Sequence, residues 1–341
     1  MLLLLLNQLT TGSIQKPMQS KVSVKLYNCT LPTLNIPFSA KLLVMTGKPV
    51  ENGQKTEIID LLDPSNHCVS IDYPHAITEG YGGLINPNLP MHCGGSPISS
   101  ECFVLSDGQF TQAESLELGV NWASGAPVIN GSLIIAGGNG DSGKLKRVSM
   151  VSPYEVKALK DLPFATRGHC TLKINDDKIM IASGHADTNY VLDTFVYDFA
   201  EDEWTPSHLL NHGRGSPACG SFELKGKTIL VVGLGYDGDV GGYINSVEYL
   251  EWETNSGWVL GPPMVKGLGP ASMVTTSTGP LVVGGKDNDG VFFGDIYQLK
   301  CSSQLIAECQ WKSMEQKLQY PRAGFVAMLI PDSLAKDLCR K

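Results

Sequence analysis

Two glycine-rich segments come nearest to known nucleotide-binding motifs. Residues 138–144 read Gly-Asn-Gly-Asp-Ser-Gly-Lys after an apolar run, which is most of a phosphate-binding loop. The match fails at Leu145, where a Ser or Thr would bind magnesium, and residues 147–151 look like a strand instead of the required helix. Residues 233–238 have the glycine spacing of a dinucleotide fingerprint, but residues 243–251 again alternate like a strand. Both segments are predicted to be turns, and no cofactor is expected.

Carboxylates and histidines are the residue types that would bind a metal ion. Residues 287–290 read Asp-Asn-Asp-Gly, as at the start of an EF-hand calcium loop, but the twelfth position holds Gln298 where Glu is needed. Further aspartates recur in equivalent segments and predict a rim of solvated carboxylates: Asp141, Asp187, Asp237 and Asp239. The histidines are scattered along the chain. We therefore expect no metal site, and the alternative is a structural cation held by the acidic rim.

The charge of the chain excludes one class of partner. The 341 residues include 26 Lys and Arg against 34 Asp and Glu, so the formal net charge is -8. An acidic protein repels a polyphosphate backbone, and we expect no nucleic-acid binding. No stretch approaches the roughly 18 uninterrupted apolar residues that a spanning helix requires, so no membrane span is predicted.

A repeated segment indicates how the elements are arranged. Short apolar runs ending in small residues, usually glycine, recur six times and end at residues 47, 95, 138, 184, 234 and 285. The successive spacings are 48, 43, 46, 50 and 51 residues. These spacings cover the range of propeller blade repeats, which are about 40 to 45 residues in WD40 proteins and about 50 in kelch proteins. The 37 glycines and 20 prolines fit a fold with many tight turns.

A second marker distinguishes between the two repeat types. After four of the glycine pairs, an aromatic residue on the next strand is followed by another on the fourth: Phe103 and Phe110, Tyr197 and Trp204, Tyr249 and Trp258, Tyr297 and Trp311. No WD40 signature accompanies any copy. The pattern resembles the kelch-repeat β-propeller over residues 41–333, and the cysteine-rich form is most similar to secreted kelch proteins of invertebrates. The first and third copies lack both aromatics.

The resemblance implies an all-β fold, a six-bladed kelch-type β-propeller with four-stranded antiparallel blades. The first repeat has no clear strand before Lys41, whereas residues 325–330 form a strand with no partner after it. We therefore predict that the C-terminal strand completes the first blade as its innermost strand, which removes two open sheet edges.

The organisation along the chain follows from this. Residues 1–40 are a lead-in, and residues 41–341 form a single propeller domain. Leu2 to Leu6 is a weak match to a signal peptide, because no basic residue precedes it and the apolar run is shorter than about 7 residues. A frayed N-terminus or a misassigned start codon explains the run equally well.

Nine cysteines bear on the cellular compartment, and their odd number leaves at least one thiol unpaired or bonded to another chain. Cys93 and Cys102 lie symmetrically about a turn on neighbouring antiparallel strands, and Cys301 and Cys309 lie likewise about Leu305. Opposed residues on such strands are close enough for a disulfide.

The other cysteines give weaker signals. One further pair is predicted among Cys29, Cys68 and Cys339, whereas Cys170 and Cys219 are predicted to be buried thiols on innermost strands. These pairs indicate an oxidising, extracellular setting, with a cytoplasmic location as the alternative. Asn28 and Asn130 are N-glycosylation acceptors if the chain is secreted, although turn geometry alone also explains Asn130.

Three arginines stand where innermost strands begin, at the predicted mouth of the central channel: Arg167, Arg214 and Arg322. This is the Pro-Arg-x-Gly position of the kelch motif, and the resemblance implies that arginines there hold acidic peptides. A guanidinium grips a carboxylate at two points. The alternative is that each arginine pairs with a carboxylate or a backbone carbonyl and braces the loops.

Three function classes follow from the resemblance. The first is a non-catalytic binding or structural scaffold, outside the cell, that presents the loop face around the channel to a protein or carbohydrate partner, including an acidic ligand. The second is a propeller enzyme acting on sugars, of the mutarotase or oxidase type; no copper ligand set can be assigned for an oxidase, whereas a mutarotase needs only an acid and a base. The third is an intracellular kelch adaptor. We expect a scaffold and not an enzyme.

Overall fold

The computed structural model describes residues 41–86, 88–128, 131–254, 256–303 and 305–339. Strands dominate this part of the chain, and their sequences show why. The segment Ser132–Ala136 is buried at every position, because its sheet has neighbours on both faces. Continuous apolar runs rich in Val, Ile and Leu are typical of such doubly covered strands.

Six sheets of four antiparallel strands are present among the described residues. In sheet order, three of them are β3 (His67–Val69), β2 (Thr56–Asp60), β1 (Lys41–Met45) and β31 (Val326–Ile330); β4 (Tyr81–Ile85), β5 (Leu89–Cys93), β6 (Cys102–Ser106) and β7 (Gln109–Gln112); and β13 (Val156–Ala158), β12 (Val148–Val151), β9 (Ser132–Ala136) and β8 (Ser124–Val128).

The other three four-stranded sheets follow the same plan. They are β15 (Cys170–Lys173), β16 (Lys178–Ala182), β19 (Thr194–Asp198) and β20 (Glu203–Pro206); β21 (Ala218–Leu224), β22 (Lys227–Gly233), β25 (Val247–Glu251) and β26 (Val259–Leu260); and β27 (Ser272–Thr276), β28 (Gly279–Val283), β29 (Asp295–Cys301) and β30 (Cys309–Lys317).

Short elements lie between the sheets. They are the pair β10 (Asn139–Gly140) and β11 (Gly143–Lys144), the trio β14 (Thr166–Arg167), β17 (His185–Ala186) and β18 (Asn189–Tyr190), the pair β23 (Tyr236–Asp237) and β24 (Gly242–Tyr243), the 3-10 turns Val50–Asn52, Trp252–Thr254 and Ile306–Glu308, and the helix α1 (Asp332–Cys339). Both glycine-rich segments thus form hairpins followed by the strands β12 and β25, which confirms that they are turns.

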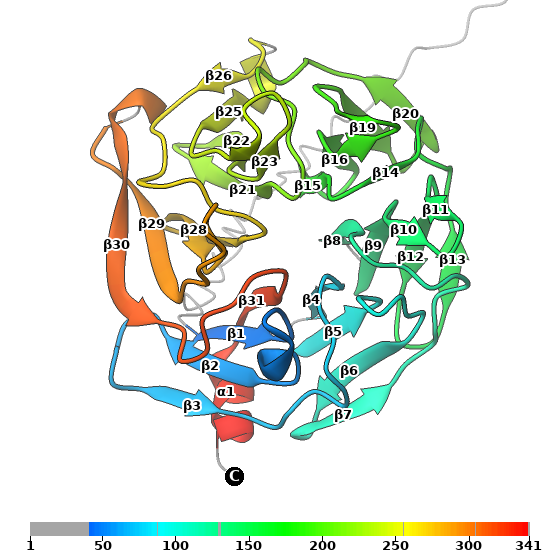
Figure 1. Ribbon diagram of the computed structural model, residues 1–341, viewed down its shortest axis with the longest axis vertical. Coiled ribbons are helices and arrows are strands. Elements are labelled where there is room, and N and C mark those ends of the chain that lie inside the picture. The colour runs from blue at the N-terminus through cyan, green and yellow to red at the C-terminus, as the bar shows by residue number, and fades with distance from the viewer. Residues whose placement is uncertain (1–40, 87, 129–130, 255, 304, 340–341) are drawn as a thin grey trace, which may run out of the picture. The chain divides into compact units, whose positions relative to one another are not determined.

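The six large sheets stand one after another around a common centre, with one strand of each facing that centre (Figure 1). The C-terminal strand β31 pairs with β1 along its whole length, with Leu43 opposite Met328. This confirms the predicted closure, since the last strand of the described chain completes the first sheet. Pairing of the two chain ends in one sheet removes the free edges that each would otherwise expose.

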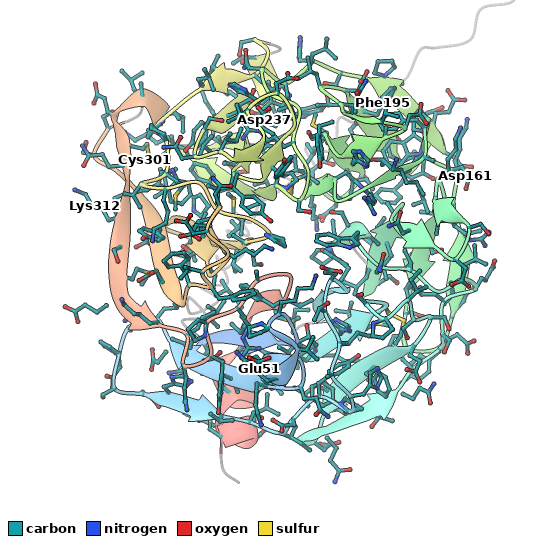
Figure 2. All side chains as sticks on the ribbon, viewed as in Figure 1. Glu51, Asp161, Phe195, Asp237, Cys301 and Lys312 are labelled. Atoms are coloured by element: carbon teal, nitrogen blue, oxygen red, sulfur yellow. A yellow bond between two sulfur atoms is a disulfide. The ribbon has the colours of Figure 1, made fainter. Side chains whose placement is uncertain are left out.

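The hydrophobic core lies between neighbouring sheets. Val231 and Tyr249 of one sheet pack against Val282 and Leu299 of the next, and all four are at most 1% exposed. Polar side chains such as those of Asp161 and Lys312 lie at the outer margin of the ring (Figure 2). Because most strands are sandwiched in this way, a low content of charged residues suits the fold.

The repeated glycine motif has a defined backbone conformation. In each repeat, two consecutive residues after the second strand have positive φ, as at Gly284 (58°) and Gly285 (99°). In the fifth repeat this pair is Leu234 (62°) and Gly235 (83°). The sequence assignment, which ended that repeat at residue 234, is therefore wrong by one residue. A leucine in the left-handed region concealed the motif, because glycine is the usual residue there.

Four disulfides join described cysteines. The predicted pairs Cys93–Cys102 and Cys301–Cys309 are both present, each with Cα atoms 4.1 Å apart across a hairpin. A third bridge joins Cys68 on β3 to Cys339 in α1, so it fastens the C-terminal helix to the outermost strand of the first sheet.

The fourth bridge corrects a prediction. Cys170 and Cys219 form a disulfide with Cα atoms 6.0 Å apart, whereas the sequence predicts two buried thiols. The sequence predictions pair cysteines within one hairpin or among Cys29, Cys68 and Cys339, and include no bridge between innermost strands of neighbouring sheets. The innermost strands β15 and β21 belong to neighbouring sheets and lie side by side around the channel, so cysteines 49 positions apart in sequence meet there.

Several sequence predictions lie outside the described residues: the lead-in 1–40 with its signal-like leucine run, Cys29, and the glycosylation candidates Asn28 and Asn130. Among the described residues, no helix has the length and apolar character needed to cross a membrane.

Candidate functional site

A channel runs between the innermost strands. Its cavity has a volume of about 510 Å³ and is lined by residues of β4, β8, β15, β21, β27 and β31, one strand from each of the six large sheets. Small residues such as Gly82, Gly125, Ala218 and Ser272 form much of the wall. Much of the channel wall therefore offers a ligand little specific side-chain chemistry.

Six residues form a ring at one end of the channel, and all of them line the channel cavity: Glu79, Trp122, Gly168, Ser216, Pro270 and Gly324. We call them the entrance ring. Each stands two residues before an innermost strand. In space, each lies beside the positive-φ loop of the preceding repeat. Backbone hydrogen bonds link neighbouring members: the N–H groups of Glu79, Trp122, Gly168, Ser216 and Gly324 donate to the carbonyls of Gly324, Glu79, Trp122, Gly168 and Pro270, at 2.7–2.9 Å.

Three members of the entrance ring have strained backbones. Glu79, Trp122 and Ser216 have φ values of 60°, 54° and 51°, in the left-handed region. Gly168 and Gly324 adopt similar values of 52° and 59° without a Cβ penalty. A non-glycine residue there costs about 1 kcal/mol or more, and such strain clusters at functional sites. All three residues line the channel cavity.

A second pocket of about 250 Å³ lies against the entrance ring. We call it the mouth pocket, and it shares Trp122, Gly168, Ser216 and Pro270 with the channel cavity. Its remaining lining is mostly aromatic: Arg167, His185, Tyr190, Gly215, Tyr236 and Tyr243. Ligand sites are typically concave, with aromatic walls and a few placed polar groups.

The aromatic side chains form a continuous row. The ring centroids are 4.9 Å apart for His185 and Tyr190, 5.6 Å for Tyr190 and Tyr236, and 5.8 Å for Tyr236 and Tyr243. Burial raises the pKa of Tyr190 and of Tyr243, so both phenols are neutral donors at physiological pH. Burial together with the charges of Lys144 and Arg167 lowers the pKa of His185, which is therefore uncharged.

Two glycines allow the tyrosines to lie close to the entrance ring. A Cβ on Gly215 would come within 2.3 Å of the Tyr190 ring, and one on Gly269 within 2.7 Å of the Tyr243 ring. Asn288 fixes Tyr243 from the neighbouring loop: its Oδ1 accepts the Tyr243 N–H at 2.7 Å and its Nδ2 donates to the Tyr243 carbonyl at 3.2 Å. The mouth pocket is thus built by several repeats together.

Arg167 is the cation of the mouth pocket. It is half-buried, and its guanidinium takes part in none of the hydrogen bonds or salt bridges found among the described residues. An unpaired guanidinium beside aromatic faces is available to a ligand carboxylate.

The structure corrects the prediction for Arg214, which is 0% exposed. Its Nη2 donates to Glu248 Oε1 at 2.7 Å and to Ser246 Oγ at 3.0 Å, and its Nη1 donates to the carbonyls of Leu234 and Ser246 at 3.1 and 3.0 Å. Glu248 is also 0% exposed. Arg214 therefore braces the interior, and a ligand at the mouth does not reach it.

Arg322 is corrected in the same way. It is 0% exposed and donates from Nη2 to Glu57 Oε1 at 2.9 Å. Its Nη1 donates to the carbonyls of Thr46 and Lys55 at 2.7 and 2.8 Å. Of the two alternatives stated for the three arginines, bracing describes Arg214 and Arg322, whereas Arg167 lines the mouth pocket.

The three arginines differ in burial because they stand at different positions relative to the entrance ring. Arg167 immediately precedes its entrance-ring residue, Gly168, and pairs with the loop residue His185. Arg214 stands two residues before its ring residue, Ser216, where Thr166 stands in the repeat of Arg167. Arg322 likewise stands two residues before Gly324. Arg214 and Arg322, two positions before the ring, are therefore enclosed in the interior, whereas Arg167, one position before it, lines the mouth pocket.

A buried carboxylate lies beside the mouth pocket. The Glu79 side chain is 2% exposed and pairs with Lys48, whose ammonium lies 5.5 Å from the centre of the Trp122 ring. Burial raises the pKa of Glu79, opposed by the charges of Lys48, Lys286 and Arg167. Sequence reasoning missed this group because Glu79, Lys48 and Trp122 come from three different repeats.

The acidic loops show no metal-binding geometry. No group of three or more His, Cys, Asp or Glu side chains among the described residues could hold a metal ion. Asp237 is 4% exposed, and its Oδ1 accepts the N–H groups of Asp239 and Val240 within its own turn. His92 is buried and bonds Tyr73 through Nδ1 at 2.9 Å.

Comparison with known proteins establishes the class of fold. No family model matches the chain, and no curated protein matches it. Among solved structures, the one titled "Structure of YjhT" aligns with 82% of this chain and 98% of that chain, with a TM-score of 0.65 and 12% sequence identity. At this identity the likeness concerns the fold alone. Together with the ring of four-stranded antiparallel sheets, it identifies an all-β propeller.

Proposed function

We propose that the chain is a six-bladed, kelch-type propeller that works as a non-catalytic binding module and holds an acidic partner in the mouth pocket. Three counts among the described residues support six blades: six four-stranded sheets, six consecutive positive-φ pairs after second strands, and six entrance-ring residues. Residues 41–341 then form one domain, with residues 1–40 as its lead-in.

The observation that carries the proposed function is the unpaired guanidinium of Arg167 in an aromatic pocket. The two buried arginines pair with internal carboxylates and carbonyls out of reach of a ligand, so Arg167 remains to bind a ligand anion. The chain as a whole has a formal charge of -8, and Arg167 supplies a cation at the mouth of this acidic protein. A cation in a pocket attracts the anionic group of a ligand.

An extracellular location fits the cysteine chemistry. Eight described cysteines are joined in four disulfides, and disulfides persist in oxidising compartments. We propose a secreted glycoprotein, with Asn28 and Asn130 as glycan acceptors and a protein or carbohydrate as partner.

Equilibrium binding to two anionic probes tests the function. The probes are a hexaglutamate peptide, which stands for an acidic protein segment, and trigalacturonate, which stands for an acidic glycan. We expect at least one to bind, and Arg167→Met to weaken that binding about 10-fold or more, as loss of a charged hydrogen bond does. Lys160→Met is the control, because Lys160 is exposed and pairs with Glu203 away from the channel. Binding of neither probe, or equal affinity of the Arg167 variant, contradicts the function.

One observation favours a second candidate, a propeller enzyme acting on sugars. Glu79 is a buried acid with a raised pKa, and it lines the channel beside the ammonium of Lys48. Burial that raises the pKa of a carboxyl group favours its protonated form, and such a group can donate a proton to a substrate. Exchange spectroscopy of the anomers of galacturonic acid tests this candidate: faster interconversion with the wild-type protein, lost in Glu79→Gln, is the result that an enzyme requires.

A further inference from the structure

The entrance ring is interrupted at one position, and the interruption borders the mouth pocket. Five ring residues donate their N–H to the preceding ring carbonyl. The sixth, Pro270, has no N–H to donate, so the carbonyl of its predecessor Ser216 receives no ring hydrogen bond. Both residues line the mouth pocket. Among the described residues the Ser216 carbonyl accepts no backbone or side-chain hydrogen bond, so it is available as an acceptor for a hydroxyl or amide of a ligand in the pocket that Ser216 lines.

Ser216 lies next to the other candidate binding groups. Its N–H donates to the Gly168 carbonyl at 2.7 Å, which places it beside the residue that follows Arg167. The preceding residue, Gly215, exchanges two backbone hydrogen bonds of 2.8 Å with Tyr236. One small pocket therefore brings together a cation, an unused acceptor and aromatic rings.

We propose that the occupant of the mouth pocket is an acidic sugar ring of the hexuronate type; this inference rests on the proposed function. The carboxylate binds Arg167, a ring hydroxyl donates to the Ser216 carbonyl, and the C–H face of the sugar packs against the tyrosines. The C–H bonds of a sugar are polarised by neighbouring oxygens, so they complement the negative face of an aromatic ring.

An acidic peptide satisfies fewer of these groups. A Glu or Asp side chain offers Arg167 a carboxylate, but the side chain itself has no donor for the Ser216 carbonyl and no saturated ring face for the tyrosine row, so a donor would have to come from the peptide backbone. A uronate carries all three features on one rigid ring. The pocket volume of about 250 Å³ also suits a small cyclic group better than an extended chain.

Restoring the missing hydrogen bond tests the inference. Pro270→Ala supplies an N–H at the interrupted position, which should close the ring onto the Ser216 carbonyl and remove the acceptor. We expect trigalacturonate affinity to fall roughly 2- to 10-fold, the usual effect of one neutral hydrogen bond, with hexaglutamate affinity unchanged. Pro206→Ala is the control, because Pro206 is exposed on the outer strand β20.

Amide hydrogen exchange at position 270 reports whether the ring has closed in this variant. A protected amide with unchanged trigalacturonate affinity overturns the inference, as does an unprotected amide, which would mean that the Ser216 carbonyl points elsewhere. Binding of hexaglutamate but not trigalacturonate to the wild-type protein overturns the inference and leaves the proposed function standing. Binding of neither probe overturns both.

Discussion

The contrast between Arg214 and Arg167 leads to a quantitative prediction about stability. Replacing Arg214 with Met removes four hydrogen bonds of 2.7–3.1 Å and leaves Glu248, which is 0% exposed, without its cation. Removing one partner of a buried ion pair costs about 3–5 kcal/mol. Replacing Arg167 with Met removes no hydrogen bond or salt bridge found among the described residues, so we expect a change within about 0.5 kcal/mol.

Guanidinium chloride unfolding followed by tryptophan fluorescence, with the disulfides intact, measures both values. Equal slopes for the variants and the wild type are needed before the midpoints are compared as free energies. The double variant Arg214→Met/Glu248→Met is the internal control, and we expect it to recover most of the loss because no buried charge remains. An Arg214 variant within 1 kcal/mol of wild type, or an Arg167 variant destabilised by 3 kcal/mol or more, would refute the assignment of bracing and ligand-facing roles.

Three further predictions follow from the fold. Deleting residues 320–341 removes β31 and leaves β1 with an open edge, so the cooperative thermal transition should disappear; a deletion protein that melts like the full chain contradicts closure. Burial lowers the pKa of His92 to about 3 and that of His169 to about 4. The histidines of the unfolded chain have pKa values of about 6.5, so below that pH the unfolded state binds more protons than the folded state. The free energy of unfolding should therefore fall by about 2 kcal/mol per histidine between pH 7 and 5. Unfolding free energies that do not change over this range would exclude buried neutral histidines. The Cys170–Cys219 bridge closes a loop of 49 residues, and its removal in a double Cys→Ala variant should cost about 4 kcal/mol by the chain-entropy relation; peptide mapping that finds both thiols free would exclude the bridge.

The sequence predicts most of the scaffold because the scaffold depends on local patterns. The period near 48 residues, the apolar strands and the unpaired C-terminal strand together led to closure by β31. Cys93 and Cys102 were paired correctly because both lie in one hairpin. Cys170 and Cys219 were not, because their contact depends on how neighbouring sheets sit around the channel.

The site was predicted less completely, for a related physical reason. Arg167 was found through its motif, but the same motif also selected Arg214, whose offset of one residue turns it from the mouth into the interior. Tyr190 and Tyr243 were not singled out, because they stand in short hairpins whose convergence is a property of the ring. The sequence signal for these tyrosines is the pair of glycines that their rings contact, Gly215 and Gly269.

The central claim is that the partner binds at the mouth pocket, and hydrogen-exchange mass spectrometry tests it most directly. The measurement compares the free protein with the protein saturated by whichever anionic probe binds. The account predicts that protection on binding is confined to the loops at residues 184–190 and 235–243 and to the entrance ring. Protection confined to the outer strands or to the hairpins at the opposite end of the channel, such as residues 173–178, would contradict it.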